Sequence, residues 1–399
     1  MSFDPVSDIQ DYLVFGEYGD VNPSITDSST YTFLSPKKME ELFDHEIEGC
    51  FLYSRHWNPI NKDLSEALAK LEGAELAQVT SSGMAAISSA IFQLCSMGDE
   101  IISGHTIYGG TYAFFKNFLP RFGISVKFIN INDTDEVVKS ISSRTKIIYC
   151  ESVSNPLLEV ADLPALSSVA KANNITLVVD NTFSPLTIAP IMHGADIAIH
   201  SLTKFINGTS DCVAGCVCGS SEFIHKLIDI NRGASMLLGP VLDSHRAASI
   251  LKNLHSLHLR IQQHCRNAMF LAENLEGLGI KVFYPGLKSH KHHERINQLR
   301  NPDFGYGGML AIDLGTREIA DKLMVRMQEE KVGYLAVSLG YFKTLFSSPS
   351  HSTSSEIPVE EQKEIGISEG LIRISVGLDH NIQRTFERIK KCLREVGYK

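Results

Sequence analysis

A lysine beside a buried strand is the residue of this sequence with the clearest chemical use. Lys204 ends the apolar run in DIAIHSLTKFINGTSD, close to the hydroxyls of Ser201 and Thr203. Desolvating an ammonium group is costly, so a lysine placed there is expected to be used, although a surface lysine is the alternative. Its amine could form a Schiff base, and the hydroxyls could bind a phosphate.

A carboxylate ends the preceding strand-like run. Asp180 closes the apolar part of TLVVDNTFSP, and Pro185 stops regular structure soon afterwards. Such an acid is often only a cap or a turn former. Together with Lys204, however, it is the group that could keep a heteroaromatic ring nitrogen protonated.

A third motif, TSSGMAAISSAIFQL, turns from a β-rich run through Ser81, Ser82 and Gly83 into an amphipathic helix. The N-terminus of a helix offers unpaired N–H groups to an anion. Plain N-capping by serine explains many such turns, so this motif alone is weak. A Schiff-base lysine, phosphate ligands and an acid for a pyridinium nitrogen are, together, what pyridoxal phosphate (PLP) chemistry requires. GxGxxG, GxxxxGK[ST] and HExxH are all absent.

Alternating helical and β-rich segments must position these residues. Helical patterns occur at 64–73, 84–95 and 163–174, and β-rich runs at 124–130, 146–151, 176–180 and 196–201. This alternation predicts βαβ units around a mostly parallel sheet, whose ligands bind at the carboxyl ends of the strands. Glu151, Asp180 and Ser201 lie at those ends, so we expect them to meet in one crevice.

The remaining segments suggest three parts of the chain. Residues 1–59 lack periodicity and predict an extended N-terminal arm; residues 60–245 predict the large cofactor-binding domain. Residues 246–399 open with a long helical stretch and predict a smaller C-terminal domain. The His-rich segment 286–298 is interpreted as an exposed polar connection, with a metal site as the alternative, and the Ser-rich segment 347–356 as a loop.

Composition agrees with a folded enzyme and excludes several other classes. The 399 residues suffice for two or three domains, and 43 % are hydrophobic. A formal charge of -9 offers no basic surface for nucleic acid or anionic lipid. The N-terminus does not resemble a targeting signal and no stretch is apolar enough to span a bilayer, so we expect a cytoplasmic protein. The eight cysteines include no CxxC, which favours buried thiols and no metal site.

Eight motifs of the sequence resemble the Cys/Met metabolism family of PLP-dependent enzymes. They are YSRHWNP, SSGMAAISS, IYGGTYA, ESVSNP, VVDNTFSP, HSLTKF, VSLGYFKTL and GLIRISVG, which follow the family's order from about residue 14 to the C-terminus. The resemblance implies the α/β fold of the fold-type I PLP-dependent transferases. That fold has a mostly parallel sheet in its large domain, a smaller C-terminal α/β domain and an N-terminal arm.

The resemblance also implies how the cofactor is held. Lys204 would be the Schiff-base lysine and the proton shuttle between Cα and Cβ, and Asp180 would pair with the pyridine nitrogen. The phosphate would be held by the backbone amides and hydroxyls of Gly83, Met84, Ser201 and Thr203. Tyr53 and Arg55 would reach the phosphate of a neighbouring subunit, which implies a site shared within a dimer and a homotetramer as the assembly.

Four further residues are implied to act on the cofactor or the substrate. Tyr108 would stack on the ring and act as acid or base near the γ-substituent, a role for which its pKa would be lowered by nearby cations. Asn155 would bind the phenolic oxygen of the cofactor. Arg373 would clamp the substrate carboxylate with both guanidinium nitrogens, assisted by Ser338. Without the resemblance, Tyr108 reads as a packing residue.

Two positions bear on the reaction. Gly110 stands where many bacterial methionine γ-lyases have cysteine, but FGEYGDVNPS and SLGYFKTLFSSPSHSTSSE resemble the plant-type methionine γ-lyases, which share this glycine. Lys343 stands where relatives that bind cystathionine generally have glutamate, and a lysine would repel the distal ammonium group of cystathionine. The expected activity is therefore γ-elimination of L-methionine to methanethiol, 2-oxobutanoate and ammonia.

Three alternatives stay open. Cystathionine γ-lyase shares the chemistry, and a γ-replacement transferase, such as a cystathionine γ-synthase or an O-acetylhomoserine sulfhydrylase, shares every residue named. A PLP-binding protein without catalysis is the remote alternative, because Lys204, Asp180, Tyr108 and Arg373 are all present.

Overall fold

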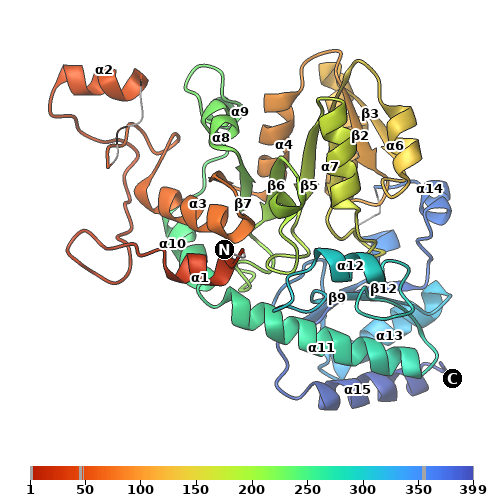
Figure 1. The fold of residues 1–399 in the computed structure, drawn as a ribbon. Coiled ribbons are helices and arrows are strands. Elements are labelled where there is room, and N and C mark those ends of the chain that lie inside the picture. The colour runs from red at the N-terminus through yellow and green to blue at the C-terminus, as the bar shows by residue number, and fades with distance from the viewer. Residues whose placement is uncertain (1–2, 45–46, 48, 353–355, 399) are drawn as a thin grey trace.

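The computed structural model describes residues 3–44, 47, 49–352 and 356–398, which form two β-sheets with helices packed against them (Figure 1). The seven strands of the first sheet are β1 Leu76–Thr80, β2 Glu100–Gly104, β3 Ser125–Ile129, β4 Thr145–Glu151, β5 Thr176–Asp180, β6 Ile197–Ser201 and β7 Gly215–Gly219. The five of the second are β8 Lys281–Phe283, β9 Met309–Asp313, β10 Gly333–Leu335, β11 Thr344–Ser347 and β12 Leu371–Ser375.

The first sheet is mostly parallel, as the sequence predicts. Its strands lie in the order β1-β7-β6-β5-β4-β2-β3, and only β7 runs antiparallel to its neighbours β1 and β6. Alternate residues enter the apolar clusters on its two faces: Ile148 and Cys150 of β4 enter one cluster, and Ile147 and Tyr149 enter the other. Strands buried on both faces explain the nearly continuous runs of isoleucine and valine.

Fifteen α-helices occur among the described residues. They are α1 Pro5–Gln10, α2 Pro36–Asp44, α3 Pro59–Glu72, α4 Gly83–Leu94, α5 Gly109–Ala113, α6 Thr134–Ser140, α7 Leu163–Ala172, α8 Ser221–Leu227, α9 Ala234–Leu238, α10 Ser244–Leu254, α11 Leu257–Gly277, α12 His293–Leu299, α13 Arg317–Glu329, α14 Val359–Glu364 and α15 Ile382–Glu395. Shorter helical turns are η1 Phe114–Phe118, η2 Leu119–Phe122, η3 Pro190–His193 and η4 Pro349–His351.

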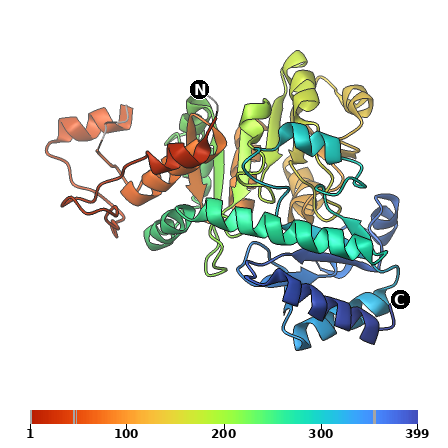
Figure 2. The same ribbon diagram turned by 60° about the horizontal axis from the view of Figure 1, so that its bottom comes forward.

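The second sheet has its own apolar core and completes the α/β fold. Its strands lie in the order β10-β11-β12-β9-β8, antiparallel except for the pair β10 and β11. Helix α11 joins the two cores: Ile261 and Cys265 pack with the large sheet, whereas Leu271 and Leu275 pack with the small one. Figure 2 shows α11, in green to teal, running between these two parts. A division of the chain at residues 59 and 245 stays our proposal.

The long helical stretch predicted after residue 245 is two helices, because α10 ends at Leu254 and α11 begins at Leu257. The N-terminal segment also differs from the irregular arm that was predicted, since α1 and α2 interrupt it. In Figure 1 α2 lies away from the body of the molecule. Leu13, Tyr18, Val21 and Leu34 of this segment are at least 69 % exposed.

The His-rich segment is not an exposed connection, and this prediction is wrong. Helix α12 begins at His293 within it, and His290 is only 9 % exposed. The Nδ1 atom of His292 accepts a hydrogen bond from the backbone N–H of Val160 at 2.9 Å, so the segment packs against the large domain. The histidines therefore satisfy buried backbone groups.

Two further observations concern metals and membranes. Across the described part of the chain, no cluster of three or more His, Cys, Asp or Glu side chains is arranged to hold a metal ion. Nor does any described helix combine the length and the apolar character needed to cross a bilayer.

Cys216 and Cys218 are buried in β7 as free thiols, as expected. The predicted Ser-rich loop includes residues 353–355, which lie outside the described residues.

Candidate active site

A pocket of about 380 Å³ opens where three neighbouring strands of the large sheet end. Glu151 ends β4, Asp180 ends β5 and Ser201 ends β6, and all three residues line the pocket. Parallel strands bring their carboxyl ends to one edge of a sheet, where ligands of such sheets bind. The predicted convergence of these three residues is confirmed.

Most residues singled out in the sequence meet in this pocket. Its lining includes Gly83, Met84, Tyr108, Asn155, Asp180, Ser201, Thr203, Lys204 and Arg373. Ser338 lies beside it, because its hydroxyl accepts a hydrogen bond from the Lys204 amine at 3.2 Å. Tyr53 and Arg55 do not line it. Arg55 instead donates to the backbone oxygen of Met236 at 3.0 Å.

Lys204 is held in a buried turn directly after β6. Its backbone N–H donates to the carbonyl oxygen of Ser201 at 3.3 Å, and the turn continues directly into Phe205. Burial, and then the guanidinium of Arg373, lower the pKa of Lys204 to about 8. A substantial fraction of its amine is therefore neutral near physiological pH, and the neutral amine is the form that attacks an aldehyde.

Arg260 fixes the turn that carries this lysine. From α11 its guanidinium donates to the carbonyl oxygen of Phe205 at 2.5 Å and to that of Ile206 at 2.7 Å. A third bond, at 2.9 Å, reaches the carbonyl oxygen of Asn253 at the end of α10. A single partly buried cation thus satisfies three backbone acceptors and ties the Lys204 turn to two helices.

Asp180 is a buried carboxylate that faces the pocket. It accepts hydrogen bonds from the backbone N–H of Thr182 at 2.9 Å and from the hydroxyl of Tyr149 at 3.5 Å. Burial raises its pKa, and the hydrogen bonds from Thr182 oppose this rise. Among the described residues no lysine, arginine or histidine forms an ion pair with it, so a cation in the pocket is the partner that it lacks.

The N-terminus of α4 lies against Ser201. The Ser82 hydroxyl caps the helix by accepting from the backbone N–H of Ala85 at 3.0 Å. A Cβ atom built on Gly83 would lie only 2.8 Å from the Cβ atom of Ser201. The glycine thus lets the first amides of a twelve-residue helix approach the serine, which is a suitable cradle for an anion. The Thr203 hydroxyl, also in the lining, is bonded to the backbone of Ala214 at 3.0 and 3.2 Å.

Tyr108 precedes α5 and is fixed by its backbone. Its N–H donates to Oε1 of Glu151 at 2.7 Å. Its ring lies over Gly110, where an added Cβ atom would be 2.5 Å from the Cε1 atom of Tyr108. The predicted lowering of its pKa is wrong: burial, followed by the carboxylate of Glu356, raises the pKa of Tyr108, and the opposing charge of Arg373 is too weak.

Arg373, Asn155 and Glu151 form one hydrogen-bonded group. Arg373 projects from β12 and donates to Oδ1 of Asn155 at 3.1 Å. The backbone N–H of Asn155 donates to Oε2 of Glu151 at 2.8 Å. Because the side-chain oxygen of Asn155 accepts from arginine, its amide nitrogen is left to donate elsewhere. Burial lowers the pKa of Arg373 to about 10, so the guanidinium stays charged.

Lys343 does not face the pocket, contrary to the hypothesis built on it. Its amine pairs with Oδ1 of Asp379 at 3.7 Å, just before β11 begins. The pocket lining instead contains Val337, Leu339 and the carboxylate residue Glu356. The repulsion of a distal ammonium group by Lys343 therefore has no structural basis.

Sequence reasoning gave no role to several lining residues. Glu151 was expected in the crevice, but not as the acceptor that holds both Tyr108 and Asn155 by their backbones. Glu356 follows a Ser-rich segment without any recognisable signal. Val337 precedes Ser338 directly, and that adjacency is the signal that could have placed it.

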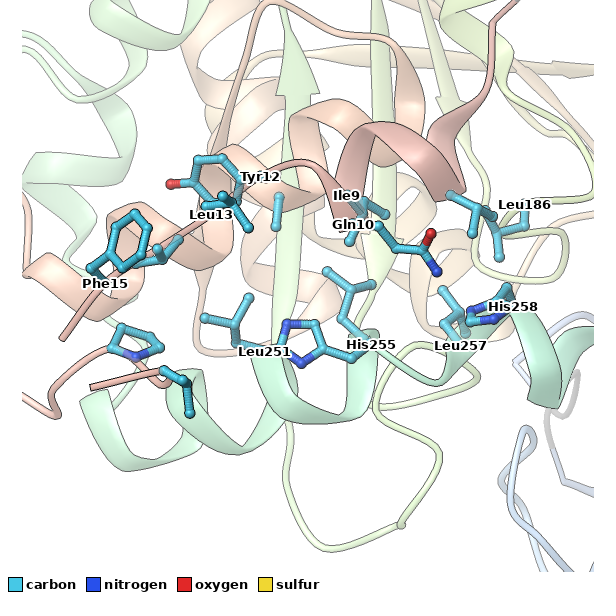
Figure 3. A pocket seen from close by; sticks show the side chains of 16 residues that line it. Ile9, Gln10, Tyr12, Leu13, Phe15, Leu186, Leu251, His255, Leu257 and His258 are labelled. Carbon is cyan, nitrogen blue, oxygen red and sulfur yellow. The ribbon is translucent and has the colours of Figure 1, made fainter. Parts of the chain in front are cut away.

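A larger hollow, of about 470 Å³, lies elsewhere (Figure 3). It is bounded by α1 and the segment after it on one side, including Ile9 and Phe15, and by Leu251, His255 and His258 on the other. Its lining has no lysine, arginine, aspartate or glutamate. The hollow therefore lacks the convergent charged groups that mark the pocket around Lys204.

The pocket fits the cofactor that the resemblance implies. PLP needs an amine for its aldehyde, a carboxylate for its pyridinium nitrogen and donors for its phosphate. Lys204 has a depressed pKa, Asp180 is buried without a cationic partner, and the α4 N-terminus adjoins Ser201. Each requirement is met by a residue on a different element around one pocket.

Comparisons with known proteins give a consistent result. The chain matches the family described as Cys/Met metabolism PLP-dependent enzyme over residues 13–388. It is 43 % identical to methionine gamma-lyase of Arabidopsis thaliana over 384 residues, covering 95 % of this chain and 87 % of that one. It is 34 % identical to O-succinylhomoserine sulfhydrylase of Pseudomonas aeruginosa over 368 residues, covering 91 % and 88 %.

A solved structure with the same fold contains the PLP cofactor bound to a lysine. The putative O-acetylhomoserine (thiol)-lyase of Campylobacter jejuni contains N'-pyridoxyl-lysine-5'-monophosphate. It superposes with a TM-score of 0.90 at 27 % identity, covering 98 % of this chain and 100 % of the other. The architecture is thus that of the fold-type I PLP-dependent enzymes. With the family's pattern running through nearly the whole sequence and a pocket suited to PLP, the chain belongs to the Cys/Met metabolism family of PLP-dependent enzymes.

Proposed function

We propose that this protein catalyses the γ-elimination of L-methionine to methanethiol, 2-oxobutanoate and ammonia. The observation that carries the proposal is the apolar lining around the charged groups of the pocket. It consists of Met84, Ile87, Val153, Phe183, Val213, Val337 and Leu339. An uncharged thioether side chain loses little by leaving water for such a lining. The name of the Arabidopsis relative supports the same substrate.

We assign the recognition of the substrate carboxylate to Arg373. Its guanidinium is 3 % exposed, stays charged and is oriented by Asn155, so it can bind a carboxylate with two nitrogens. Ser338 links this guanidinium to Lys204. Its backbone oxygen accepts from Arg373 at 3.5 Å, and its hydroxyl accepts from the Lys204 amine at 3.2 Å. A bound amino acid would thus have its carboxylate and its α-carbon close to the only two described cations of the pocket lining.

We assign the proton transfers to Lys204 and Tyr108. Bound PLP supplies an electron sink that stabilises negative charge on the substrate carbons. The amine of Lys204, whose pKa is about 8, can take the proton from Cα near neutral pH, return it to the bound cofactor, and then take a proton from Cβ. The phenol of Tyr108, whose pKa is raised, stays protonated and can donate to the departing thiolate sulfur.

We assign the cofactor contacts to the elements around the pocket. The carboxylate of Asp180 would keep the ring nitrogen protonated, and the amide of Asn155 would donate to the phenolic oxygen. The amides of Gly83 and Met84 would bind the phosphate together with the hydroxyl of Ser201. The Thr203 hydroxyl already bonds to Ala214, so we place it in the wall that supports the phosphate site.

We propose that the site is completed by a second copy of the chain. Tyr53 and Arg55 lie outside their own pocket, and the arm that carries them exposes apolar side chains. Exposed apolar surface of this kind is typical of an interface. In a dimer, and in a homotetramer built from two dimers, Tyr53 and Arg55 would reach the phosphate in the partner subunit.

Cystathionine is a second candidate substrate, which a specific observation favours. Lys343 is paired with Asp379, whereas the carboxylate of Glu356 lines the pocket near Tyr108. A carboxylate there could pair with the distal ammonium group of cystathionine. The distal ammonium group of cystathionine would therefore meet the negative charge of Glu356 and not the positive charge of Lys343.

A comparison of substrates tests the proposal. Values of kcat/KM are to be measured for L-methionine, for L-cystathionine, and for O-acetylhomoserine with and without methanethiol. We expect methionine to be preferred and its turnover to be independent of added thiol. Replacement of an acyl group as the faster reaction would identify a transferase. Glu356→Gln should lower kcat/KM for cystathionine severalfold while leaving that for methionine within about twofold.

A further inference from the structure

A buried ion pair lies behind the pocket and has no role in the function proposed above. Glu72, at the C-terminal end of α3, and His200, in β6, are joined by a 2.6 Å contact between Oε1 and Nε2. Both side chains are 1 % exposed. Neither residue lines the pocket. A pair so far from water demands a reason, because desolvation of two charged groups is expensive.

The pair is only half satisfied. Oε2 of Glu72 and Nδ1 of His200 are buried, and neither has a hydrogen-bond partner among the described residues. Replacing such a pair by apolar side chains of similar volume is often neutral or stabilising. The pair is therefore poorly explained as a source of stability, and its surroundings point to another purpose.

The residue next to Asp180 is bonded to this pair. Asn181 directly follows Asp180 and donates through its amide to the same Oε1 atom of Glu72, at 2.9 Å. The backbone of Asn181 is bonded to β6 through the carbonyl oxygen of Ile199, the residue before His200. Glu72 thus connects the residue after the pocket carboxylate with the residue before Ser201.

Electrostatic interactions also connect Glu72 and His200 with Asp180. Burial works against a charged imidazole, but the carboxylate of Glu72 outweighs it, so the pKa of His200 is raised. A protonated His200 in turn opposes the effect of burial on Asp180, after the hydrogen bonds from Thr182. The other titratable groups that act on Asp180 or His200 are Tyr149, Cys150 and Glu151 from β4 and Cys216 from β7. None of these four can supply a positive charge.

We propose that the Glu72–His200 pair is a positioning device that keeps Asp180 ionised, so that the ring nitrogen of PLP stays protonated. The proposal rests on the assigned role of Asp180. His200 supplies the buried positive charge, Glu72 holds that charge in place, and Asn181 fixes the end of β5 between them. Neither Glu72 nor His200 touches the cofactor or the substrate.

Two substitutions separate charge from packing. Glu72→Gln keeps an oxygen that can accept from both His200 and Asn181, but it removes the negative charge. His200→Gln keeps a donor for Glu72 and removes the positive charge. Both variants should therefore weaken the ionisation of Asp180. If His200→Gln does not fold, Glu72→Gln decides the question alone, because it changes no side-chain volume appreciably.

The readout is the protonation of the cofactor, observed without any substrate. The ¹⁵N chemical shift of the ring nitrogen is to be measured in holoenzyme reconstituted with ¹⁵N-labelled PLP, together with the Kd of PLP for the apoenzyme. We expect both variants to move the shift toward the unprotonated value and to weaken PLP binding by about tenfold, as with residues that orient metal ligands from behind. The acid limb of kcat should move to higher pH, because Asp180 then takes up its proton earlier.

Two controls distinguish the possible failures. Tyr284→Phe removes another fully buried polar group, in the second domain, and should lower stability without moving the ¹⁵N shift. Asp180→Asn should move the shift fully. A wild-type shift in Asp180→Asn would overturn the role of Asp180 itself. A moved shift in Asp180→Asn with wild-type shifts in Glu72→Gln and His200→Gln would overturn only the inference on the pair.

Discussion

Two residues of the pocket lie in surroundings that disfavour their charged forms. Lys204 is an amine whose charge is disfavoured by burial and by Arg373, and Asp180 is a buried carboxylate with no directly paired cation among the described residues. In an ordinary core both would be destabilising. Perturbed groups that converge in one cleft are typical of catalytic sites, and a cofactor that brings an aldehyde and a ring cation relieves both.

The first prediction concerns the phenolic hydroxyl of Tyr108. Tyr108→Phe keeps the ring over Gly110 but removes the proton donor, so kcat for methionine should fall by about 10²-fold while PLP remains bound. Because the raised pKa keeps the phenol protonated, wild-type activity should be lost only as the pH rises through a value above that of ordinary tyrosine. A pH–rate profile checks this, and the variant should lack that basic limb. An unchanged basic limb in Tyr108→Phe would assign the proton to another group.

Sequence reasoning at the residue scale succeeded where chain position implies location. Lys204, Asp180 and Ser201 could be placed because residues at the ends of parallel strands share one edge of the sheet. It failed where the orientation of a side chain or the electrostatic effect of residues distant in sequence decides the outcome. Lys343 was placed by alignment of motifs, but its amine turns to Asp379. The pKa of Tyr108 depends first on burial and then on Glu356, which is remote in sequence.

At the scale of elements, the phosphate site depends on how closely α4 approaches β6. Gly83→Ala places a methyl group against Ser201, and one of the two elements must shift. We expect the Kd of PLP to rise about tenfold, a cost within the usual range for overpacking. Gly277→Ala is the matched control, because nothing lies within 4 Å of its added Cβ atom. Equal PLP affinity in the two variants would contradict the assigned cradle.

Arg260 gives the prediction for the turn that carries the reactive lysine. Arg260→Leu leaves the carbonyl oxygens of Phe205, Ile206 and Asn253 without their donor. The free energy of unfolding should fall by about 3 kcal/mol, and kcat should fall as the turn loosens. Denaturant titration and kinetics measure the two effects. Arg266→Ala, an exposed arginine of the same helix, should change neither.

Elements could be predicted well where one period persists. The strands that end at Glu151, Asp180 and Ser201 were predicted almost to the residue, because buried parallel strands are unbroken apolar runs. The break between α10 and α11 and the start of α12 were not predicted. Both depend on tertiary packing, such as the bond from Val160 to His292, which no local pattern records.

At the scale of the whole molecule, the chain carries residues that its own pocket does not use. The arm before α3 holds Tyr53 and Arg55 away from that pocket, and Leu34 within it is fully exposed. The resemblance suggested a shared site, and the positions of these residues agree with it. A second chain is the natural cover for such a surface.

Mixing two inactive variants tests the shared site. Arg55→Ala lacks the residue given to the partner, and Lys204→Ala lacks the reactive amine, so each alone should be nearly inactive. In a mixed dimer, one site combines Lys204 from the first chain with Arg55 from the second. Co-refolding equal amounts should restore about a quarter of wild-type activity, as expected for random pairing in symmetric dimers. No recovery in verified mixed dimers would show that each chain uses its own Arg55.

The proposed function requires that methionine itself is cleaved. Purified holoenzyme should be incubated with L-methionine and no added thiol, and 2-oxobutanoate and methanethiol should be measured together. We expect equal amounts of both products, and neither product from Lys204→Ala. No product from methionine, with turnover of cystathionine or of O-acetylhomoserine plus thiol by the same preparation, would contradict the claim and leave the family and its cofactor in place.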